Sequence, residues 1–267
     1  MTDDPANTAP SVLHNGIRVL RAFSVNDPAL GVTEIARRVD LHKSTASRIL
    51  AQLEQMDLVA RDVDSGRFRL GTGLIALAGP LLANLDVRRM AYPALAGLTE
   101  RTSETSALVV WTGNESVSVE QVASPLHVKH TSPIGTRFGT AASSSVQVFL
   151  SAMSDAQVRE LLGQRLLGGR GDDHEVRRLL DRLAKVRAEG VALNLGETSI
   201  EEIGISAPVR DHRGHTIAAI LLSAPSFRVS EQLRHQLAEA VRTTAEDVSE
   251  QLGAASVRRD VPEGGSD

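Results

Sequence analysis

Apolar residues recur at a helical period through the N-terminal quarter of the chain. Helices are therefore predicted over Val12–Phe23, over Glu34–Val39 with Thr33 as its N-cap, and over Lys43–Met56. In the third segment Ala46, Ile49, Leu50 and Leu53 share one face, which must be buried. The opposite face then presents polar and basic side chains to solvent.

Residues 58–70, LVARDVDSGRFRL, change to a two-residue period. The turn signal Asp64-Ser65-Gly66 lies between two short alternating runs, which is typical of a β-hairpin. In the second run Phe68 and Leu70 point to one side of the strand, and the basic side chains between them point to the other. Three helices followed by a basic hairpin predict a winged helix-turn-helix over residues 11–72.

The next segment, Leu74–Leu85, is apolar on all sides. An all-round apolar helix needs burial all round, so we predict a linker helix over 73–90 that contacts a second subunit. Its uncharged stretch is too short to span a bilayer. Asp86–Thr102 continues as a more polar helix, with a kink or restart expected at Pro93.

The remainder of the chain mixes strand and helix patterns. Strands are predicted at Ser106–Trp111, Val117–Ala123, Leu126–His130, Val191–Leu195, Gly204–Val209 and His215–Ser223, and helices at Ser143–Met153, Asp155–Leu162, Glu175–Glu189 and Glu231–Leu252. Paired strands joined by short turns favour a mostly antiparallel sheet flanked by helices, an α+β domain over residues 91–253. Residues 1–10 and 254–267 are expected to be disordered tails.

The net charge differs between the N-terminal part and the remainder of the chain. The net charge is −4, and residues 11–70 hold nine basic and seven acidic side chains, so this segment has +2 and the remainder −6. That sign suits a DNA-binding N-terminal part. The chain has no cysteine, which removes disulfides and Cys-ligated zinc. The polar N-terminus lacks the features of a signal peptide, so a cytoplasmic protein without a membrane partner is expected.

In a helix-turn-helix the second helix lies in the major groove, with its N-terminal residues near base edges and phosphates. The segment LHKSTASRIL offers cations and small hydroxyls at that place, and the hairpin adds cations for the flanking backbone or minor groove. The expected DNA contacts are Lys43, Ser44, Thr45, Ser47, Arg48, Arg67 and Arg69. The alternative is a surface helix made soluble by its charges; the preceding short helix and the basic hairpin favour DNA.

The run VTEIARRVDLHKSTASRILAQLEQMDLVARDVDSGRFRLG, the apolar segment after it and the later run GETSIEEIGISAPVRDHRGHTIAAILLSAP together resemble IclR-family (isocitrate lyase regulator type) transcription factors over residues 11–253. The resemblance implies a winged helix-turn-helix, a dimerising linker helix and a C-terminal GAF-like domain that binds a small-molecule effector. It further implies homodimers and homotetramers that bind double-stranded operator DNA, and we expect a repressor.

The resemblance also implies that the effector lies against one face of the C-terminal sheet. One wall is the start of a helix in GTRFGTAASSS, whose free backbone N–H groups suit a carboxylate; the loop 194–202 and two facing strands are the others. The implied effector-binding residues are Thr140, Ala141, Ala142, Ser143, Asn194, Glu197, Gly204, Ser206, Leu221 and Ser223. Such small side chains would equally let a helix pack closely on a sheet, which is the alternative.

The sequence departs from the family pattern in the helix-start segment and at one strand position. Ser143-Ser144 stands where many relatives have Gly-Lys after Thr-Ala-Ala, and the preceding Pro is missing. Leu221 replaces a polar residue found in members that bind very small oxo acids. A larger, partly apolar carboxylic acid is therefore the expected effector.

Three other motifs favour no further activity. Gly71–Ala76 fits the dinucleotide fingerprint GxGxxA, but a helix takes the place of the required second strand. His127 and His130 would point to opposite faces of a strand and cannot share a metal. Gly204–Pro208 lacks the second glycine of a nucleophile elbow. No cofactor, metal or catalytic set is expected. A DNA-binding regulator with a vestigial sensor domain and, last, a small-metabolite enzyme are the alternatives.

Overall fold

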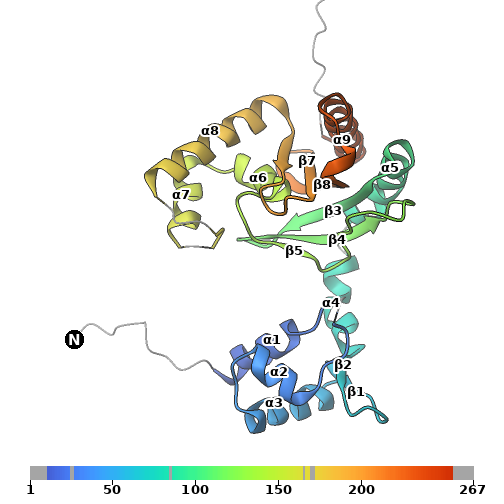
Figure 1. The fold of residues 1–267 in the computed structure, drawn as a ribbon, viewed down its shortest axis with the longest axis vertical. Helices are drawn as coiled ribbons and strands as arrows, with labels where there is room; N and C mark the ends of the chain where they lie inside the picture. Colours follow the sequence, from blue (N-terminus) through green and yellow to red (C-terminus); the bar gives the residue numbers. More distant parts are fainter. Residues whose placement is uncertain (1–10, 25–26, 84–85, 165, 169–171, 255–267) are drawn as a thin grey trace, which may run out of the picture. The chain divides into compact units, whose positions relative to one another are not determined.

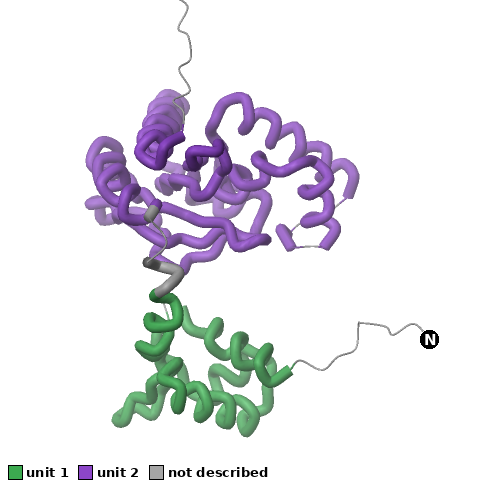
Figure 2. Tube along the Cα trace, turned by 180° about the vertical axis from the view of Figure 1, so that it is seen from behind, with its two compact units in different colours: residues 1–85 green, residues 86–267 purple. Residues whose placement is uncertain are grey.

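The computed structural model describes residues 11–24, 27–83, 86–164, 166–168 and 172–254, and the chain divides into two compact units, residues 1–85 and 86–267 (Figure 2). The predicted tail 1–10 and, except for Ala254, the tail 254–267 lie outside the described residues. No helix in the described ranges is long and apolar enough to cross a membrane.

The first unit is a small helical domain with a hairpin (Figure 1). Its elements are α1 (Val12–Arg21), α2 (Val32–Arg38), α3 (Lys43–Gln55), β1 (Val59–Arg61), β2 (Phe68–Leu70) and α4 (Gly73–Ala83). The α3 face predicted from its apolar spacing is buried. It joins a core cluster of Val19, Phe23, Leu30, Ile35, Val39, Ile49, Leu50, Leu53, Leu58, Val59 and Phe68. The predicted winged helix-turn-helix is confirmed.

The predicted N-cap of the second helix is wrong. Gly31, not Thr33, is the N-cap of α2, and no side chain caps this helix. The cause is a contact distant in sequence. The backbone N–H of Leu30 donates to the carbonyl of Phe68 at 2.9 Å, and the N–H of Phe68 donates back at 2.8 Å. Leu30 is thereby held as a third, one-residue strand beside β2, and the helix begins directly after it.

The second unit is an antiparallel sheet covered by helices (Figure 1). In chain order the elements are α5 (Asp86–Thr102), β3 (Thr105–Trp111), β4 (Ser116–Val122), β5 (Arg137–Phe138), α6 (Ser144–Ser151), α7 (Asp155–Gly163), α8 (Asp173–Glu189), β6 (Ala192–Leu195), β7 (Glu202–Arg210), β8 (Thr216–Pro225), the 3-10 helix η1 (Ser226–Arg228) and α9 (Glu231–Gln251). The strand order is β5-β4-β3-β8-β7-β6, which confirms the predicted α+β class.

The strand register shows which helices cover which face. Leu221 on β8 lies opposite Ala107 on β3, and both belong to a core cluster with residues of α6 and α8. Successive strand residues point to opposite faces, so Ser106 faces the other side, where its hydroxyl donates to the carbonyl of Leu95 on α5 at 2.9 Å. Arg101 of α5 donates to Thr244 of α9 at 3.1 Å. The sheet therefore lies between α6 and α8 on one face and α5 and α9 on the other.

Three local expectations are corrected. Residues 126–130 form bends and irregular backbone rather than the predicted strand, because Lys129 donates to the carbonyl of Ser124 at 2.8 Å and the carbonyl of Val128 accepts from Arg228 at 3.0 Å. β5 is a two-residue strand that the sequence pattern did not predict. α5 runs through Pro93 as a single helix, so the restart predicted there is wrong, while the alternative of a kink stays a prediction.

Candidate functional site

The start of α3 presents the side chains expected to contact DNA. Lys43, Ser44, Ser47 and Arg48 are exposed, and Thr45 is half-buried. None of the four exposed side chains forms a hydrogen bond or ion pair with any residue in the described part of the chain. His42 is the N-cap and supplies no side-chain hydrogen bond to the helix. This end of α3 therefore offers two unpaired cations and two free hydroxyls on one surface.

The hairpin holds its two candidate arginines in different ways. The guanidinium of Arg67 donates to the carbonyl of Ala29 at 2.9 Å and to the carboxylate of Glu34 at 3.1 Å, which ties the wing to α2. Arg69 has no hydrogen bond or ion pair with a described residue, and its charge acts on Asp62 at a distance. Arg61 lies over the ring of Phe68 at 5.7 Å. Of the two predicted wing contacts, only Arg69 keeps its cation unpaired.

The tip of the wing is fixed by one carboxylate. Asp62 accepts hydrogen bonds from the hydroxyl of Ser65 at 2.7 Å and from its backbone N–H at 2.8 Å. These hydrogen bonds favour the ionised form and lower the pKa of Asp62 below its ordinary value. Gly66 follows with a φ of 65°, a conformation that glycine adopts without strain. The turn predicted at Asp64-Ser65-Gly66 is therefore built on a hydrogen-bonded Asp62.

In the second unit, a cavity of about 230 Å³ opens at the N-terminal end of α6; we call it the α6 cavity. Five of the ten predicted effector residues line it: Thr140, Ser143, Asn194, Gly204 and Leu221. Three further lining residues, Thr198, Ser199 and Glu202, belong to the loop 194–202 that was expected as a wall, although they were not named individually. The sequence did not single out the remaining lining residues, which are Arg137, Phe138, Gly139, Ser144 and Ser145. Arg137, Phe138, Gly139, Ser144 and Ser145 all lie within or beside the quoted run GTRFGTAASSS, where composition alone gave no reason to choose among them.

Serine pairs fasten α6 to the sheet beneath this cavity. The hydroxyls of Ser144 and Ser206 are 2.8 Å apart, and those of Ser145 and Ser116 are also 2.8 Å apart. A methyl group on Gly204 would lie 3.0 Å from the Ser144 hydroxyl, so glycine leaves room for this close approach. Ser206 is therefore a buried support of α6 and not a lining residue.

Two features of the α6 cavity suit an anion, and one lining carboxylate opposes it. Ser143 is the N-cap of α6 but its side chain caps no N–H group, which leaves the positive end of the helix without a side-chain acceptor. Among the described lining residues Arg137 is the one cation, and it is held by Glu115, with Nε 2.8 Å from the carboxylate; Glu202 adds a carboxylate to the lining. Ser223, opposite Gly204 in the strand register, is buried, and its hydroxyl has no partner among the described residues.

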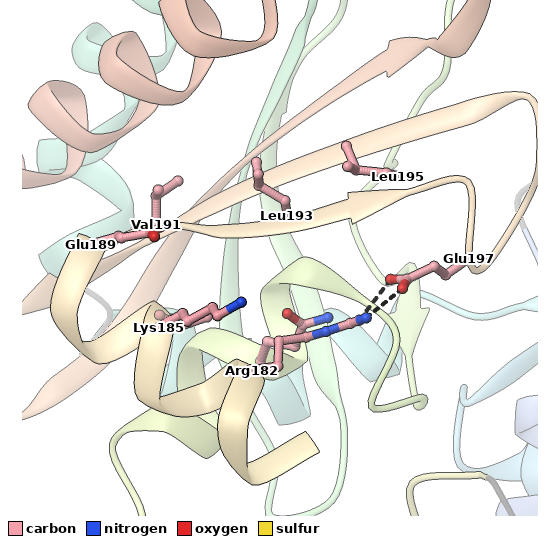
Figure 3. Close-up of a pocket in the computed structure, with 9 residues that line it drawn as sticks. Arg182, Lys185, Glu189, Val191, Leu193, Leu195 and Glu197 are labelled. Carbon is pink, nitrogen blue, oxygen red and sulfur yellow. Dashed lines mark hydrogen bonds and ion pairs between the residues drawn. The ribbon is translucent and has the colours of Figure 1, made fainter. Parts of the chain in front are cut away.

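The other predicted effector residues lie elsewhere. Glu197 pairs with Arg182 of α8 through two hydrogen bonds of 2.8 and 2.6 Å (Figure 3). It lines two neighbouring cavities rather than the α6 cavity, and Ala141 and Ala142 line one of these. The prediction therefore placed the helix start and the strands together correctly, while the loop residue Glu197 points to a different partner.

The motifs set aside on sequence have structural explanations. A methyl group on Gly71 would lie 2.0 Å from the carbonyl oxygen of Asp57, so this glycine allows the connection between β2 and α4 to pass close to the turn after α3. No group of three or more metal-binding side chains occurs within the described ranges.

Comparison with known proteins decides the family. Residues 12–63 match the IclR helix-turn-helix domain, and residues 80–250 match the C-terminal domain of the bacterial transcriptional regulator IclR. The chain belongs to the IclR family. This is the family whose motifs the sequence resembled, and it makes the chain a DNA-binding transcriptional regulator with a ligand-responsive C-terminal domain.

Individual IclR-family relatives agree over most of the chain. The HTH-type transcriptional repressor AllR of Escherichia coli K12 is 27% identical, covering 93% of this chain and 92% of its own. An IclR homologue of Microbacterium hydrocarbonoxydans, solved in complex with 4-hydroxybenzoate, is 27% identical with a TM-score of 0.75 and covers 92% of this chain and 100% of its own. A solved domain of another IclR-family regulator is 48% identical with a TM-score of 0.62, covering 64% of this chain and 99% of its own.

Proposed function

We propose that this regulator is a cytoplasmic repressor and not an enzyme. An organic acid bound in the α6 cavity determines the affinity of the repressor for operator DNA. The observation that carries the proposal is the α6 cavity itself, where an uncapped helix N-terminus and Arg137 meet a wall that includes Leu221. Both positive features stabilise a carboxylate. Repression is supported by the name of the AllR relative.

For the DNA contacts, we propose the free face at the start of α3 and the unpaired cation of the wing. Lys43 and Arg48 would contact phosphates or guanine, Ser44, Thr45 and Ser47 phosphates or bases, and Arg69 the flanking backbone. Arg67 remains an expected contact, although its guanidinium is engaged by Glu34 and Ala29.

The effector is proposed to be a partly apolar carboxylic acid. Leu221 and Phe138 supply apolar surface to the α6 cavity, and the Microbacterium homologue was solved with 4-hydroxybenzoate. The effector acts only if it has different affinities for the DNA-bound and DNA-free forms. We expect 4-hydroxybenzoate to bind more tightly than 4-hydroxybenzamide, which has the same ring but no charge, and more tightly than the very small acid glyoxylate.

Calorimetric titration of the full chain with these three compounds, repeated in the presence of operator DNA, tests this proposal. Equal affinities for the acid and the amide would contradict a carboxylate site. If no organic acid in a broad screen changed either thermal stability or DNA affinity, the C-terminal domain would be a vestigial sensor. Turnover of a bound acid would instead indicate an enzyme.

We further propose that α4 joins two copies of the chain, as dimers that can pair into tetramers. Ile75 and Leu77 on this helix are 67% and 68% exposed in the single chain, an arrangement expected where a partner subunit covers them. Leu77→Asp should lower the sedimentation coefficient by placing a charge in that contact, whereas Leu13→Asp, the same change at an exposed position of α1, should leave it unchanged. An unaltered oligomer for Leu77→Asp would rule out α4 as the contact.

A further inference from the structure

A second cavity, separate from the α6 cavity, lies between α8 and the edge strand β6 (Figure 3). Its volume is about 210 Å³, and none of the described residues lines both this cavity and the α6 cavity. We call it the α8 cavity. Val186, Val191, Leu193 and Leu195 form its apolar lining. The size and this lining suit a small molecule with a short aliphatic part.

One buried polar atom beside this cavity has no hydrogen-bond partner among the described residues. Gln147 of α6 lines the α8 cavity and is fully buried. Its amide nitrogen donates to the carbonyl of Ala142 at 3.0 Å, which fixes the orientation of the amide group. The amide oxygen finds no hydrogen-bond donor among the described residues. A buried acceptor left without a donor is unfavourable, so a ligand that supplies an N–H or O–H group would be favoured here.

The charges around the cavity balance. Arg182 is already paired with Glu197. Lys185 and Glu189 also line the cavity, and neither forms a hydrogen bond or ion pair with a residue in the described part of the chain. Figure 3 shows Lys185 extending from α8 toward the space beneath β6. One free cation and one free carboxylate complement a ligand that carries both charges, and they disfavour a simple anion.

We propose that the α8 cavity binds an aliphatic α-amino acid in its zwitterionic form. The ammonium group donates to the amide oxygen of Gln147 and pairs with Glu189, because it has three donors and no acceptor. The carboxylate pairs with Lys185. The aliphatic side chain packs on the apolar lining formed by residues of α8 and β6. The regulator would then have a site for an amino acid in addition to its organic-acid effector.

The experiment titrates the full chain with L-leucine, L-valine and L-methionine by calorimetry. Two analogues of leucine test the need for both charges: 4-methylpentanoate lacks the ammonium group, and 3-methylbutylamine lacks the carboxylate. We expect the best amino acid to bind at least tenfold more tightly than either analogue. No binding by any of the three amino acids would overturn the proposal.

Variants at exposed positions then locate the site without endangering the fold. Lys185→Met and Glu189→Gln should each weaken amino-acid binding at least tenfold. Arg177→Met removes a cation from the same helix outside this cavity and should have no effect. Arg137→Ala, in the α6 cavity, should also leave the amino-acid affinity unchanged. Unaltered binding in both α8 variants, or binding lost only in Arg137→Ala, would overturn the proposal while leaving the organic-acid proposal intact.

Discussion

The recognition helix α3 and the α6 cavity are assembled in opposite ways. In α3 the buried and the free faces come from a single run of thirteen residues. The α6 cavity takes Arg137 from β5, Ser144 from α6 and Gly204 from β7, segments far apart in the chain. A surface built from one helix depends on local spacing, whereas a cavity built from several elements depends on how they pack. The two regions should therefore respond differently to substitution.

The sharpest test removes both free cations of α3. Lys43→Ala combined with Arg48→Ala should weaken operator binding roughly a thousandfold, because each lost base contact costs about 1 to 3 kcal/mol and each lost phosphate contact lowers the salt slope by about one. Effector affinity should not change. Fluorescence anisotropy over a range of salt concentrations measures the operator affinity and the salt slope. Arg159→Ala, an exposed cation of the second unit, is the control. Unchanged operator affinity in the double variant would remove α3 from the DNA interface.

A core substitution tests whether the two regions are stable independently. Leu50 is fully buried in the core of the first unit. Leu50→Ala should lower the free energy of unfolding of that unit by about 2 to 5 kcal/mol through lost contacts and a residual cavity. Calorimetry should then show an earlier transition for the first unit, with effector binding retained below it. Leu13→Ala, at a position that is 76% exposed, should change stability by about 0.5 kcal/mol or less.

This contrast also explains which structural features could be predicted from the sequence. The buried register of α3 and the hairpin follow from local periods, and both were predicted correctly. Thr33 failed as an N-cap because pairing between Leu30 and Phe68 moved the helix start. The strand wrongly predicted at 126–130 has an alternating pattern, but Arg228, a hundred residues later, donates a hydrogen bond to the carbonyl of Val128. Local pattern carries no information about such partners.

The site residues divide along the same line. The resemblance of GTRFGTAASSS to a family segment correctly indicated that Thr140 and Ser143 lie at the α6 cavity. It did not indicate Arg137 or Ser144. Arg137 is held by Glu115, and Ser144 by Ser206, and these partners come from other parts of the chain. Glu197 was assigned to the effector because the resemblance implied the loop 194–202 as a wall of the site. Its pairing with Arg182 on α8 directs its carboxylate elsewhere, and only the fold reveals that pairing.

Arg137 provides the corresponding test for the α6 cavity. Arg137→Ala should weaken 4-hydroxybenzoate binding roughly tenfold to a hundredfold, since a hydrogen bond to a charged group contributes about 1.5 to 3 kcal/mol. The affinity for operator DNA without ligand should stay the same. Arg187→Ala is a matched control, because both side chains are close to two-fifths exposed and both form an ion pair. If the two variants bound the acid equally well, Arg137 would serve only to hold β5 through Glu115.

The smallest expected effects separate the two arginines of the wing. Arg69→Ala should weaken operator binding a few-fold and reduce the salt slope by about one, because its cation is free to neutralise a phosphate. Arg67→Ala should change the salt slope less, since its guanidinium is engaged by Glu34 and Ala29. Its main effect should fall on stability, by about 0.2 to 1 kcal/mol for an ion pair that is 48% exposed on the arginine side. Equal losses of salt dependence in the two variants would mean that Arg67 leaves Glu34 when the wing binds DNA. The conformation of the wing would then depend on bound DNA, just as the α6 cavity depends on the packing of several elements.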